Sequence, residues 1–188
     1  MYNGLEVKLL AITPDSENLV EKAGRLCYAS GDKQGTNENW ISARVKQGHE
    51  SLIEHACATF YIKASRALTH ELVRHRIASY SQRSQRYIKE TKADYITPPE
   101  LMGEALQVYI QAVEAAWDTY RRLLSEGIKP EIARYVLPNA CSTDIICTWN
   151  FREIRHIIKT RTSPAALPEM RAVAGRIAEI MREQAPRV

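Results

Sequence analysis

The feature that most constrains the fold is a regular alternation of side chains over residues 55–64. Apolar residues take every second position of this segment (Ala56, Ala58, Phe60 and Ile62), and Cys, Thr, Tyr and Lys stand between them. Successive side chains of a β-strand point to opposite faces, so the pattern predicts a strand with one face packed against a core.

The order of the predicted elements separates two fold classes. Two further strands are expected at residues 7–12 and 143–148, and the Arg- and Ser-rich stretch that ends at Tyr87 is expected to be irregular. Helices are expected over residues 15–28, 36–48, 65–74, 100–126, 130–137, 150–161 and 168–183. This order does not repeat a βα unit, which favours an α+β fold, with a mixed or antiparallel sheet and flanking helices, over a doubly wound sheet.

Length and composition are those of an ordinary globular domain. The chain has 188 residues, of which 45% are hydrophobic and 26% are charged, so we expect a single domain over residues 1–188. No apolar stretch approaches the about 20 residues of a membrane helix, and the first ten residues contain no apolar block typical of an export signal. We therefore expect a cytoplasmic protein without a membrane partner.

The cysteines and histidines do not indicate a metal site. The four cysteines, at positions 27, 57, 141 and 147, form no CxxC pair, and their apolar neighbours predict buried, reduced thiols. His70 and His75 are five residues apart. On a helix this spacing separates two side chains by about 140°, so that they do not bind one metal ion together.

The net charge of +4 is concentrated in one short stretch. Residues 66–86 contain five arginines, no lysine and a single acidic residue, Glu71, and they account for the whole excess. Serines and glutamines stand between the arginines. A guanidinium group binds phosphate in a bidentate manner, and hydroxyl and amide groups satisfy the remaining acceptors, so this composition fits a pocket for a phosphorylated small molecule. A solvated basic loop is the alternative interpretation.

Two arginines outside this stretch are expected to face inward. Arg134 stands among apolar residues, and Arg161 follows Ile154 by two turns of the predicted helix. Buried arginines usually have an anionic partner, and the nearby acids do not suffice for all of these arginines, so a negatively charged ligand is indicated. The sequence contains no GxGxxG loop, no Walker A loop and no GxSxG elbow, so side chains have to hold any nucleotide or flavin.

The segment RHRIASYSQRSQRY, at residues 74–87, carries a specific resemblance. Arg74, His75, Arg76 and Ser84 match the RHR-x7-S signature, and by this motif the chain resembles the flavin-dependent thymidylate synthases. Further blocks agree in order and spacing, so that the similarity extends over nearly the whole chain. These blocks are HESLIEH at residues 49–55, Leu137-Pro138, and the segment 150–161.

The resemblance implies a reaction that needs no cysteine nucleophile. Members convert dUMP to dTMP with methylene-tetrahydrofolate as the carbon donor and FAD, reduced by NADPH, as the source of hydride. It also implies an α+β homotetramer whose active sites are built from several subunits. None of the four cysteines has the Pro-Cys-His-type setting of a cysteine-dependent enzyme. With a reduced flavin supplying hydride, the protein has to bind, align and polarise the substrate.

The resemblance also assigns residues to ligands. Positions that hold the flavin are His49 (a flavin or folate contact), Ser51, Arg74, His75, Arg76, Ile77, Gln82, Asn150, Arg152 and His156. Positions that hold the nucleotide are Glu71, Arg74, Gln82, Ser84, Gln85, Arg86, Arg134 and Arg161. Arg161 is the catalytic candidate, because it would stabilise negative charge that develops on the uracil ring; an arginine is always charged and does not act as a base.

Two alternatives remain at this point. Glu71 stands where the family often has Gln, and a carboxylate beside a bound phosphate lowers affinity, so the enzyme would be impaired; Glu71→Gln tests this idea. The other alternative is a nucleic-acid-binding module in which residues 66–86 track phosphates and Tyr80 and Tyr87 stack on bases. It predicts oligonucleotide binding that weakens steeply with salt, whereas a mononucleotide pocket predicts tight dUMP binding and no nucleic-acid partner.

Overall fold

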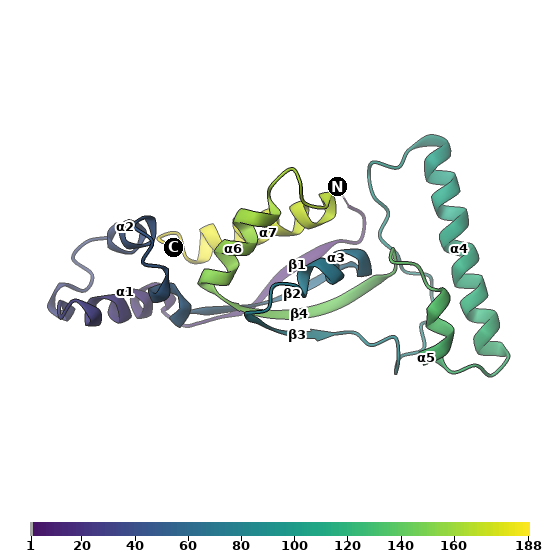
Figure 1. Ribbon diagram of the computed structural model, residues 1–188, viewed down its shortest axis with the longest axis horizontal. Helices are drawn as coiled ribbons and strands as arrows, with labels where there is room; N and C mark the ends of the chain where they lie inside the picture. The colour runs from purple at the N-terminus through teal and green to yellow at the C-terminus, as the bar shows by residue number, and fades with distance from the viewer. Residues whose placement is uncertain (1) are drawn as a thin grey trace. The chain divides into compact units, whose positions relative to one another are not determined.

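The computed structural model describes residues 2–188 (Figure 1). The strands are β1 (Glu6–Ile12), β2 (Cys57–Ser65), β3 (Ala78–Gln82) and β4 (Ser142–Asn150). The helices are α1 (Ser16–Cys27), α2 (Trp40–Lys46), α3 (Arg66–Leu72), α4 (Gly103–Ser125), α5 (Pro130–Ala133), α6 (Phe151–Arg161) and α7 (Pro168–Gln184). Short 3₁₀ helices cover Gly31–Lys33, Glu50–His55 and Arg134–Val136. Within the described residues, no helix combines the length and the apolar character needed to cross a bilayer.

The four strands form an open antiparallel sheet in the order β1-β2-β4-β3. Hydrogen bonds at the strand ends show the directions. The Thr13 N–H, just after β1, donates to the Cys57 carbonyl at the start of β2 (2.9 Å). The Phe151 N–H, just after β4, donates to the Ala56 carbonyl just before β2 (2.9 Å). An antiparallel sheet accompanied by helices confirms the predicted α+β class.

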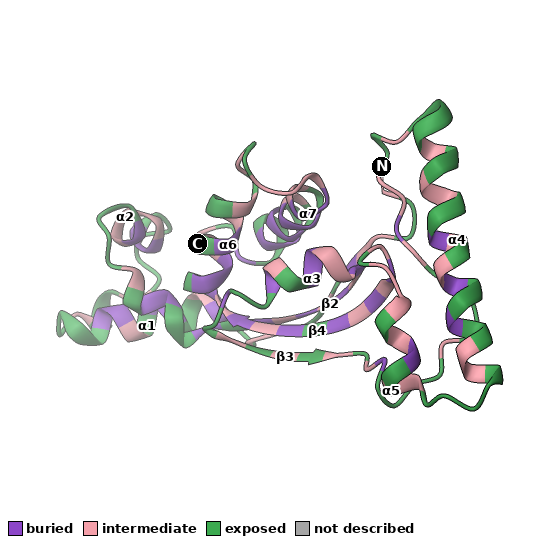
Figure 2. Cartoon of the chain, turned by 45° about the vertical axis from the view of Figure 1, so that its right-hand side comes forward, coloured by how far each residue is buried: buried purple, intermediate pink, exposed green. Residues whose placement is uncertain are grey.

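Strand β2 confirms the alternation predicted for residues 55–64. Ala58, Phe60, Ile62 and Ala64 are buried, and the residues between them are partly exposed. Strand β4 shows the same alternation, and Figure 2 shows the buried positions along both strands. The two neighbouring strands therefore contribute one apolar face each to the core, as the period of two predicts.

The stretch after Arg74 is predicted to be irregular as far as Tyr87. This prediction is wrong for part of it, because the stretch contains β3. Its side chains alternate between partly buried and exposed, beginning with the partly buried Ala78. Beyond its end, the Arg83 N–H donates to the Asp144 carbonyl of β4 at 2.8 Å. Serine-rich sequences have low strand propensity, and here the pairing with β4 at the edge of the sheet outweighs this preference.

Helix α2 begins at Trp40, four residues later than predicted, because side chains before it bind the backbone. The Thr36 hydroxyl donates to the Lys33 carbonyl (2.7 Å), and the Asn37 side chain accepts from the Asn39 N–H (2.9 Å). Such local hydrogen bonds compete with those of a helix. The other predicted helices lie where expected with ends that differ by at most three residues, except that the fifth is split into α5 and a 3₁₀ helix.

The chain divides into two compact units. The first unit contains residues 2–6, Ile62–Val73 and Ser81–Ile145. The second unit contains Val7–Tyr61, Arg74–Tyr80 and Ile146–Val188. A single domain over the whole chain stays a prediction.

The core of the first unit is built on α4. Val113, Trp117 and Tyr120 are buried at spacings of four and three residues, which places them on one face of the helix. The rings of Trp117 and Tyr120 meet edge to face, with centroids 5.8 Å apart. The Tyr120 hydroxyl accepts a hydrogen bond from the Glu90 N–H at 3.2 Å, so α4 also holds the segment that follows the signature motif.

The core of the second unit is centred on Trp149 of β4. Its ring lies 5.9 Å from that of Phe60 and 6.1 Å from that of Tyr80, measured between centroids. Helices α6 and α7 lie side by side in this unit (Figure 1), and residues such as Ile154 and Ile177 are buried there. Helix α6 has isoleucines at positions 154, 157 and 158; we expect all three on its buried face, and Ile154 and Ile157 are buried, whereas Ile158 is only partly buried.

The prediction that all four cysteines are buried is wrong for two of them. Cys141 and Cys147 are buried, but Cys27, at the end of α1, and Cys57, at the start of β2, are exposed. An end position leaves a side chain fewer neighbours than a position within an element, whatever the apolar character of the adjacent residues. Burial raises the pKa of Cys141 to about 11, and it raises the pKa of Cys147 still further.

We therefore expect the thiols to react in two classes. A disulfide reagent at pH 8 should modify two thiols quickly in the native protein and all four only after denaturation, because the reactive species is the exposed thiolate. Mass spectrometry of the labelled peptides should find the fast label on Cys27 and Cys57. Equal labelling rates for all four cysteines would contradict this assignment.

Candidate functional site

His75 lies at the centre of a hydrogen-bonded group in the second unit. Its side chain is buried, with an exposed fraction of 7% for the residue. The imidazole Nδ1 is 3.1 Å from Oε1 of Glu153, and the Nε of Arg161 donates to the imidazole Nε2 at 3.0 Å. The backbone is held as well, because the Tyr80 hydroxyl donates to the His75 carbonyl at 2.7 Å. Three residues of the signature motif and of α6 are therefore joined in one group.

These contacts fix the tautomer of His75. The Arg161 guanidinium is always protonated, so its Nε–H has to find a lone pair on Nε2. The ring proton of the neutral imidazole is then on Nδ1, where it is donated to the Glu153 carboxylate. Burial and the positive charge of Arg161 lower the pKa of His75, although the bond with Glu153 acts in the opposite direction. His75 is therefore neutral at pH 7.

Helix α6 supplies Glu153 and Arg161, two of the three partners of His75. A side-chain cap at Asn150 fixes the residue at which the helix begins. The Asn150 side chain accepts the Glu153 N–H at 2.9 Å and so caps the helix where the sequence predicts that it begins. Glu153 and Arg161 are eight residues apart, which corresponds to about 12 Å along a helix axis. Both long side chains reach the same imidazole, one from the first turn and one from the last. Arg161 is half-buried rather than fully inward as predicted.

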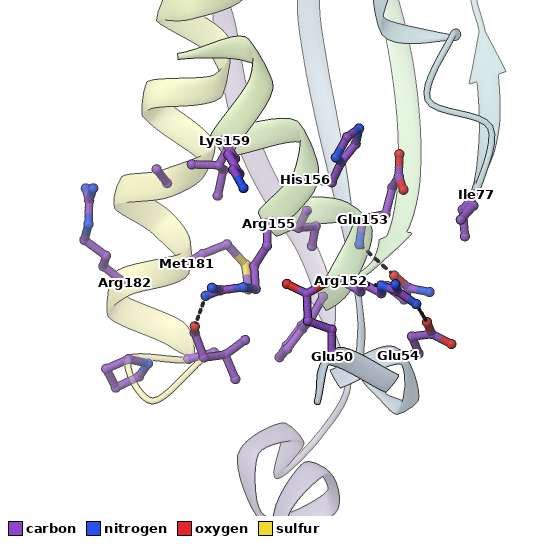
Figure 3. A pocket seen from close by; sticks show the side chains of 18 residues that line it. Glu50, Glu54, Ile77, Arg152, Glu153, Arg155, His156, Lys159, Met181 and Arg182 are labelled. Carbon is purple, nitrogen blue, oxygen red and sulfur yellow. Dashed lines mark hydrogen bonds and ion pairs between the residues drawn. The ribbon is translucent and has the colours of Figure 1, made fainter. Parts of the chain in front are cut away.

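A groove in the second unit brings together four of the predicted flavin residues. It has a volume of about 940 Å³ and is formed mainly by α6, α7 and the C-terminal residues. The predicted residues that line it are Ile77, Asn150, Arg152 and His156. Figure 3 shows side chains of α6 facing those of α7 across this groove.

The groove also contains three basic residues that the sequence analysis missed. They are Arg155 and Lys159 on α6 and Arg182 on α7. On α6 a signal was present, since residues 152, 155, 156 and 159 repeat at i, i+3, i+4 and i+7, the spacing of one helix face. Arg182 carried no such signal, because its place in the groove depends on the packing of α7 against α6.

The cations of the groove differ in their partners. Arg152 forms ion pairs with Glu54 and with Glu50, the latter at 3.4 Å. Arg155 donates from one terminal nitrogen to the carbonyl of Val188, while its Nε is buried and has no hydrogen-bond partner among the described residues. An orphaned donor of this kind, next to Lys159 and apolar side chains, fits an anionic ligand with an apolar part.

Four other residues of the predicted flavin set, His49, Ser51, Arg74 and Arg76, do not line this groove. All four are exposed residues of the second unit. Gln82 belongs to the first unit, where its side-chain amide donates to two threonine hydroxyls at 3.0 and 3.3 Å. The structure therefore brings together part of the predicted set and leaves the rest on separate surfaces.

The predicted nucleotide residues lie mostly in the first unit, and two of them, Arg86 and Arg134, bind Glu131. The Arg86 Nε donates to the Glu131 carboxylate at 3.2 Å, and the Arg134 Nε donates to its backbone carbonyl at 3.3 Å. The Ser84 hydroxyl accepts the Arg86 N–H at 3.2 Å, which shapes the loop between them. Gln85 is buried in the same unit, and Glu71 is half-buried there. Serine and guanidinium groups gathered in this way suit a phosphate.

The surplus of arginines is smaller than the sequence predicts. Arg83 pairs with Glu90 at 2.9 Å and with Asp144 at 3.5 Å, and Arg86 pairs with Glu131. Glu90 was not among the acids expected to serve the cluster, because it lies outside the basic stretch. The exposed Arg74 and Arg76 of the same stretch belong to the second unit.

Comparison with known proteins shows the family of this chain. A family model described as "Thymidylate synthase complementing protein" matches residues 8–187. The chain is 40% identical to a flavin-dependent thymidylate synthase of Geobacter sulfurreducens, over 98% of this chain and 85% of that protein. It is 38% identical to one of Clostridium tetani, over 97% and 84% of the two chains, and 36% identical to one of Sulfurisphaera tokodaii, over 98% and 76%. The chain belongs to the family of flavin-dependent thymidylate synthases.

Proposed function

We propose that this protein methylates dUMP reductively to dTMP with a bound flavin and without a cysteine nucleophile. The observation that carries the proposal is the RHR-x7-S signature in a chain that belongs to this family over nearly its whole length. FAD is the flavin in our proposal, methylene-tetrahydrofolate is the carbon donor and NADPH is the reductant. When bound and reduced, FAD supplies the hydride, and the protein binds and polarises the substrate.

The groove of the second unit fits FAD in size and chemistry. A volume of about 940 Å³ is within the range of sites for large ligands. Arg155, Lys159 and Arg182 provide positive charge for a diphosphate, whereas Arg152 is already paired with Glu50 and Glu54. Ile158 and Met181 are among the apolar residues for the rings. The orphaned Nε–H of Arg155 supports this use. In our proposal the predicted residues Ile77, Asn150, Arg152 and His156 hold FAD here, and His49, Ser51, Arg74–Ile77 and Gln82 complete its contacts.

The cluster around Glu131 fits the nucleotide phosphate. Arg86 exchanges the exposed Glu131 carboxylate for the phosphate when dUMP binds, because a dianion attracts a guanidinium more strongly than a carboxylate does. Arg134 and Ser84 supply further donors. The remaining residues of the nucleotide set in our proposal are Glu71, Arg74, Gln82, Gln85 and Arg161.

The chain's own chemistry supports a mechanism without thiolate attack. Cys141 and Cys147 are buried with raised pKa values, so neither is a thiolate at pH 7. In our proposal Arg161 donates hydrogen bonds to the uracil ring and stabilises the negative charge that develops on it.

We further propose that the active protein is a homotetramer that works in the cytoplasm. Large apolar side chains that are highly exposed in one chain support burial between subunits; they include Leu26, Met102, Tyr87 and Tyr135. The exposed, unpaired Cys27 and Cys57 suit a reducing compartment.

Absorbance spectra test the proposed function. Purified protein is expected to be yellow, with a flavin band near about 450 nm that bleaches when NADPH is added. Addition of dUMP and methylene-tetrahydrofolate should then yield dTMP. A competition titration distinguishes the proposed enzyme from a nucleic-acid-binding module. We expect dUMP to displace a fluorescent dUMP analogue and a single-stranded oligonucleotide not to displace it. Colourless protein that takes up no FAD and oxidises no NADPH would refute the proposal.

A further inference from the structure

We propose that Glu153 is a positioning residue for Arg161 and that it acts through His75. The inference rests on the proposed function, since it concerns the arginine that polarises the uracil ring. Glu153 is not among the residues that the signature or its flanking blocks assign to a ligand. Its position in the chain, in the first turn of α6, is that of an acidic residue which merely complements a helix dipole. The structure indicates a more specific role.

The contacts form a relay of two hydrogen bonds. The Glu153 carboxylate accepts the Nδ1–H of His75 at 3.1 Å, and His75 Nε2 accepts the Nε–H of Arg161 at 3.0 Å. Glu153 and His75 are each only 7% exposed, so water does not readily replace either partner. The bond to His75 engages the Nε of Arg161, the nitrogen nearest its aliphatic chain. It thereby sets the plane in which the whole guanidinium group lies.

The Glu153 carboxylate and Arg161 together keep the ring proton of His75 on Nδ1. An ionised carboxylate only accepts hydrogen bonds, so it keeps the proton of neutral His75 on Nδ1 and the lone pair on Nε2. A glutamine amide at position 153 can instead donate to Nδ1, which moves the ring proton to Nε2. Two N–H groups, those of His75 and Arg161, would then face each other. Arg161 would then lose the hydrogen bond that orients its guanidinium group, although neither Arg161 nor His75 had been replaced.

The other groups around His75 are consistent with this role. The His156 ring lies 5.6 Å from the His75 ring between centroids, and Tyr80 binds the backbone carbonyl rather than the ring. Within residues 2–188, they and the pair Glu153 and Arg161 are the titratable and charged groups found to contact or act on His75. Burial raises the pKa of Tyr80 to about 12, so its hydroxyl stays protonated and keeps donating. Glu153 is thus the one group in this set that holds the imidazole by its Nδ1.

The relay has a pH signature of defined sign. Protonation of His75 places a proton on Nε2 and removes the acceptor of Arg161, so activity should fall as the pH drops through the pKa of His75. That pKa is lowered by burial and Arg161, and the Glu153 carboxylate counteracts the lowering. Removing the carboxylate charge therefore shifts the acid limb of the pH profile to lower pH. Replacing a residue that has only a structural role would leave the pH of this acid limb unchanged.

The test compares Glu153→Gln with the wild-type holoenzyme and with Glu17→Gln as a matched control. Glu17 also lies in the second unit and loses an ion pair, with Arg187, when it is replaced. For Glu153→Gln we expect kcat for dTMP formation to fall roughly 10- to 100-fold, the usual effect of removing a group that orients a site residue. KM for dUMP and the FAD content should stay close to the wild-type values, and the acid limb of the kcat profile should move down. The control should retain wild-type kcat and pH dependence.

A second readout does not depend on turnover. Long-range ¹H–¹⁵N spectra of the histidine rings distinguish the two neutral tautomers, and we expect the proton of His75 on Nδ1 in the wild type and partly on Nε2 in Glu153→Gln, because the amide offers a donor as well as an acceptor. A wild-type protein with the proton on Nε2 would overturn the inference even if the variant failed to fold. Unchanged kcat in a folded Glu153→Gln protein, or loss of FAD as its main defect, would overturn it as well. If the wild type itself makes no dTMP, the proposed function fails, and the spectra still report on the relay.

Discussion

Replacing Arg161 with alanine is expected to lower the rate of dTMP formation by about 10²- to 10³-fold, the usual effect of removing one donor that stabilises charge in a transition state. Arg161 is half-buried, and its Nε–H is bound by His75, so the guanidinium is held before any substrate arrives. Its positive charge is permanent, and it therefore stabilises an anionic uracil ring without taking or giving a proton.

The measurement is single-turnover dTMP formation by the FAD-loaded variant, with FAD content read from the absorbance spectrum. FAD should remain bound, because Arg161 does not line the groove in which we place the cofactor. Arg176→Ala is the matched control, since Arg176 is an exposed arginine of α7 that pairs with Glu179. Undiminished turnover in the Arg161 variant would show that the catalytic role assigned to this arginine is wrong.

Replacing Trp149 with alanine is expected to cost about 3–5 kcal/mol of stability, as for other large aromatic side chains removed from a core. Trp149 is only 1% exposed and packs between Phe60 and Tyr80. Its indole N–H also donates to the Tyr80 hydroxyl at 3.1 Å, and that hydroxyl holds the carbonyl of His75. The variant therefore loses stability in two ways. A cavity forms in the core, and the tyrosine that binds the backbone of the signature motif loses a hydrogen-bond partner.

Urea denaturation followed by circular dichroism measures this cost, and Trp149→Phe serves as the companion variant. The phenylalanine ring fills much of the space of the indole but cannot donate its hydrogen bond. The variant should therefore lose about 1 kcal/mol of stability for the missing bond, and a further amount for the cavity that the smaller ring leaves. A loss of less than 1 kcal/mol for Trp149→Ala would mean that the core of the second unit is not organised around this residue.

The sequence predicts best those features that depend on one short segment. The alternation in β2 and the start of α6 at its Asn150 cap are such features, because both are determined by neighbouring residues. Strand β3 was missed, since its formation depends on β4, more than sixty residues away in the chain. The helix start at Trp40 was missed because side-chain bonds at Thr36 and Asn37 are not visible as a periodic pattern.

The residues of the candidate site likewise differ in how far the sequence predicts them. The resemblance assigns roles to His75 and Arg161, but Glu153 has the sequence position of an ordinary first-turn acid, and its partner His75 is 78 residues away. Arg182 enters the groove only because α7 packs on α6. The charge count of residues 66–86 overstated the number of unpaired arginines, because Glu90 and Glu131 lie outside that stretch and pair with Arg83 and Arg86.

The most direct measurement is dTMP formation by protein freed of FAD and by the same protein after reloading, each with and without alkylation of Cys27 and Cys57. NADPH, dUMP and methylene-tetrahydrofolate are present throughout, and the product is quantified by chromatography. We expect no dTMP without FAD and full activity after reloading, whether or not the exposed thiols are blocked. Synthesis of dTMP that proceeds without flavin, or that stops when the thiols are alkylated, would contradict the account.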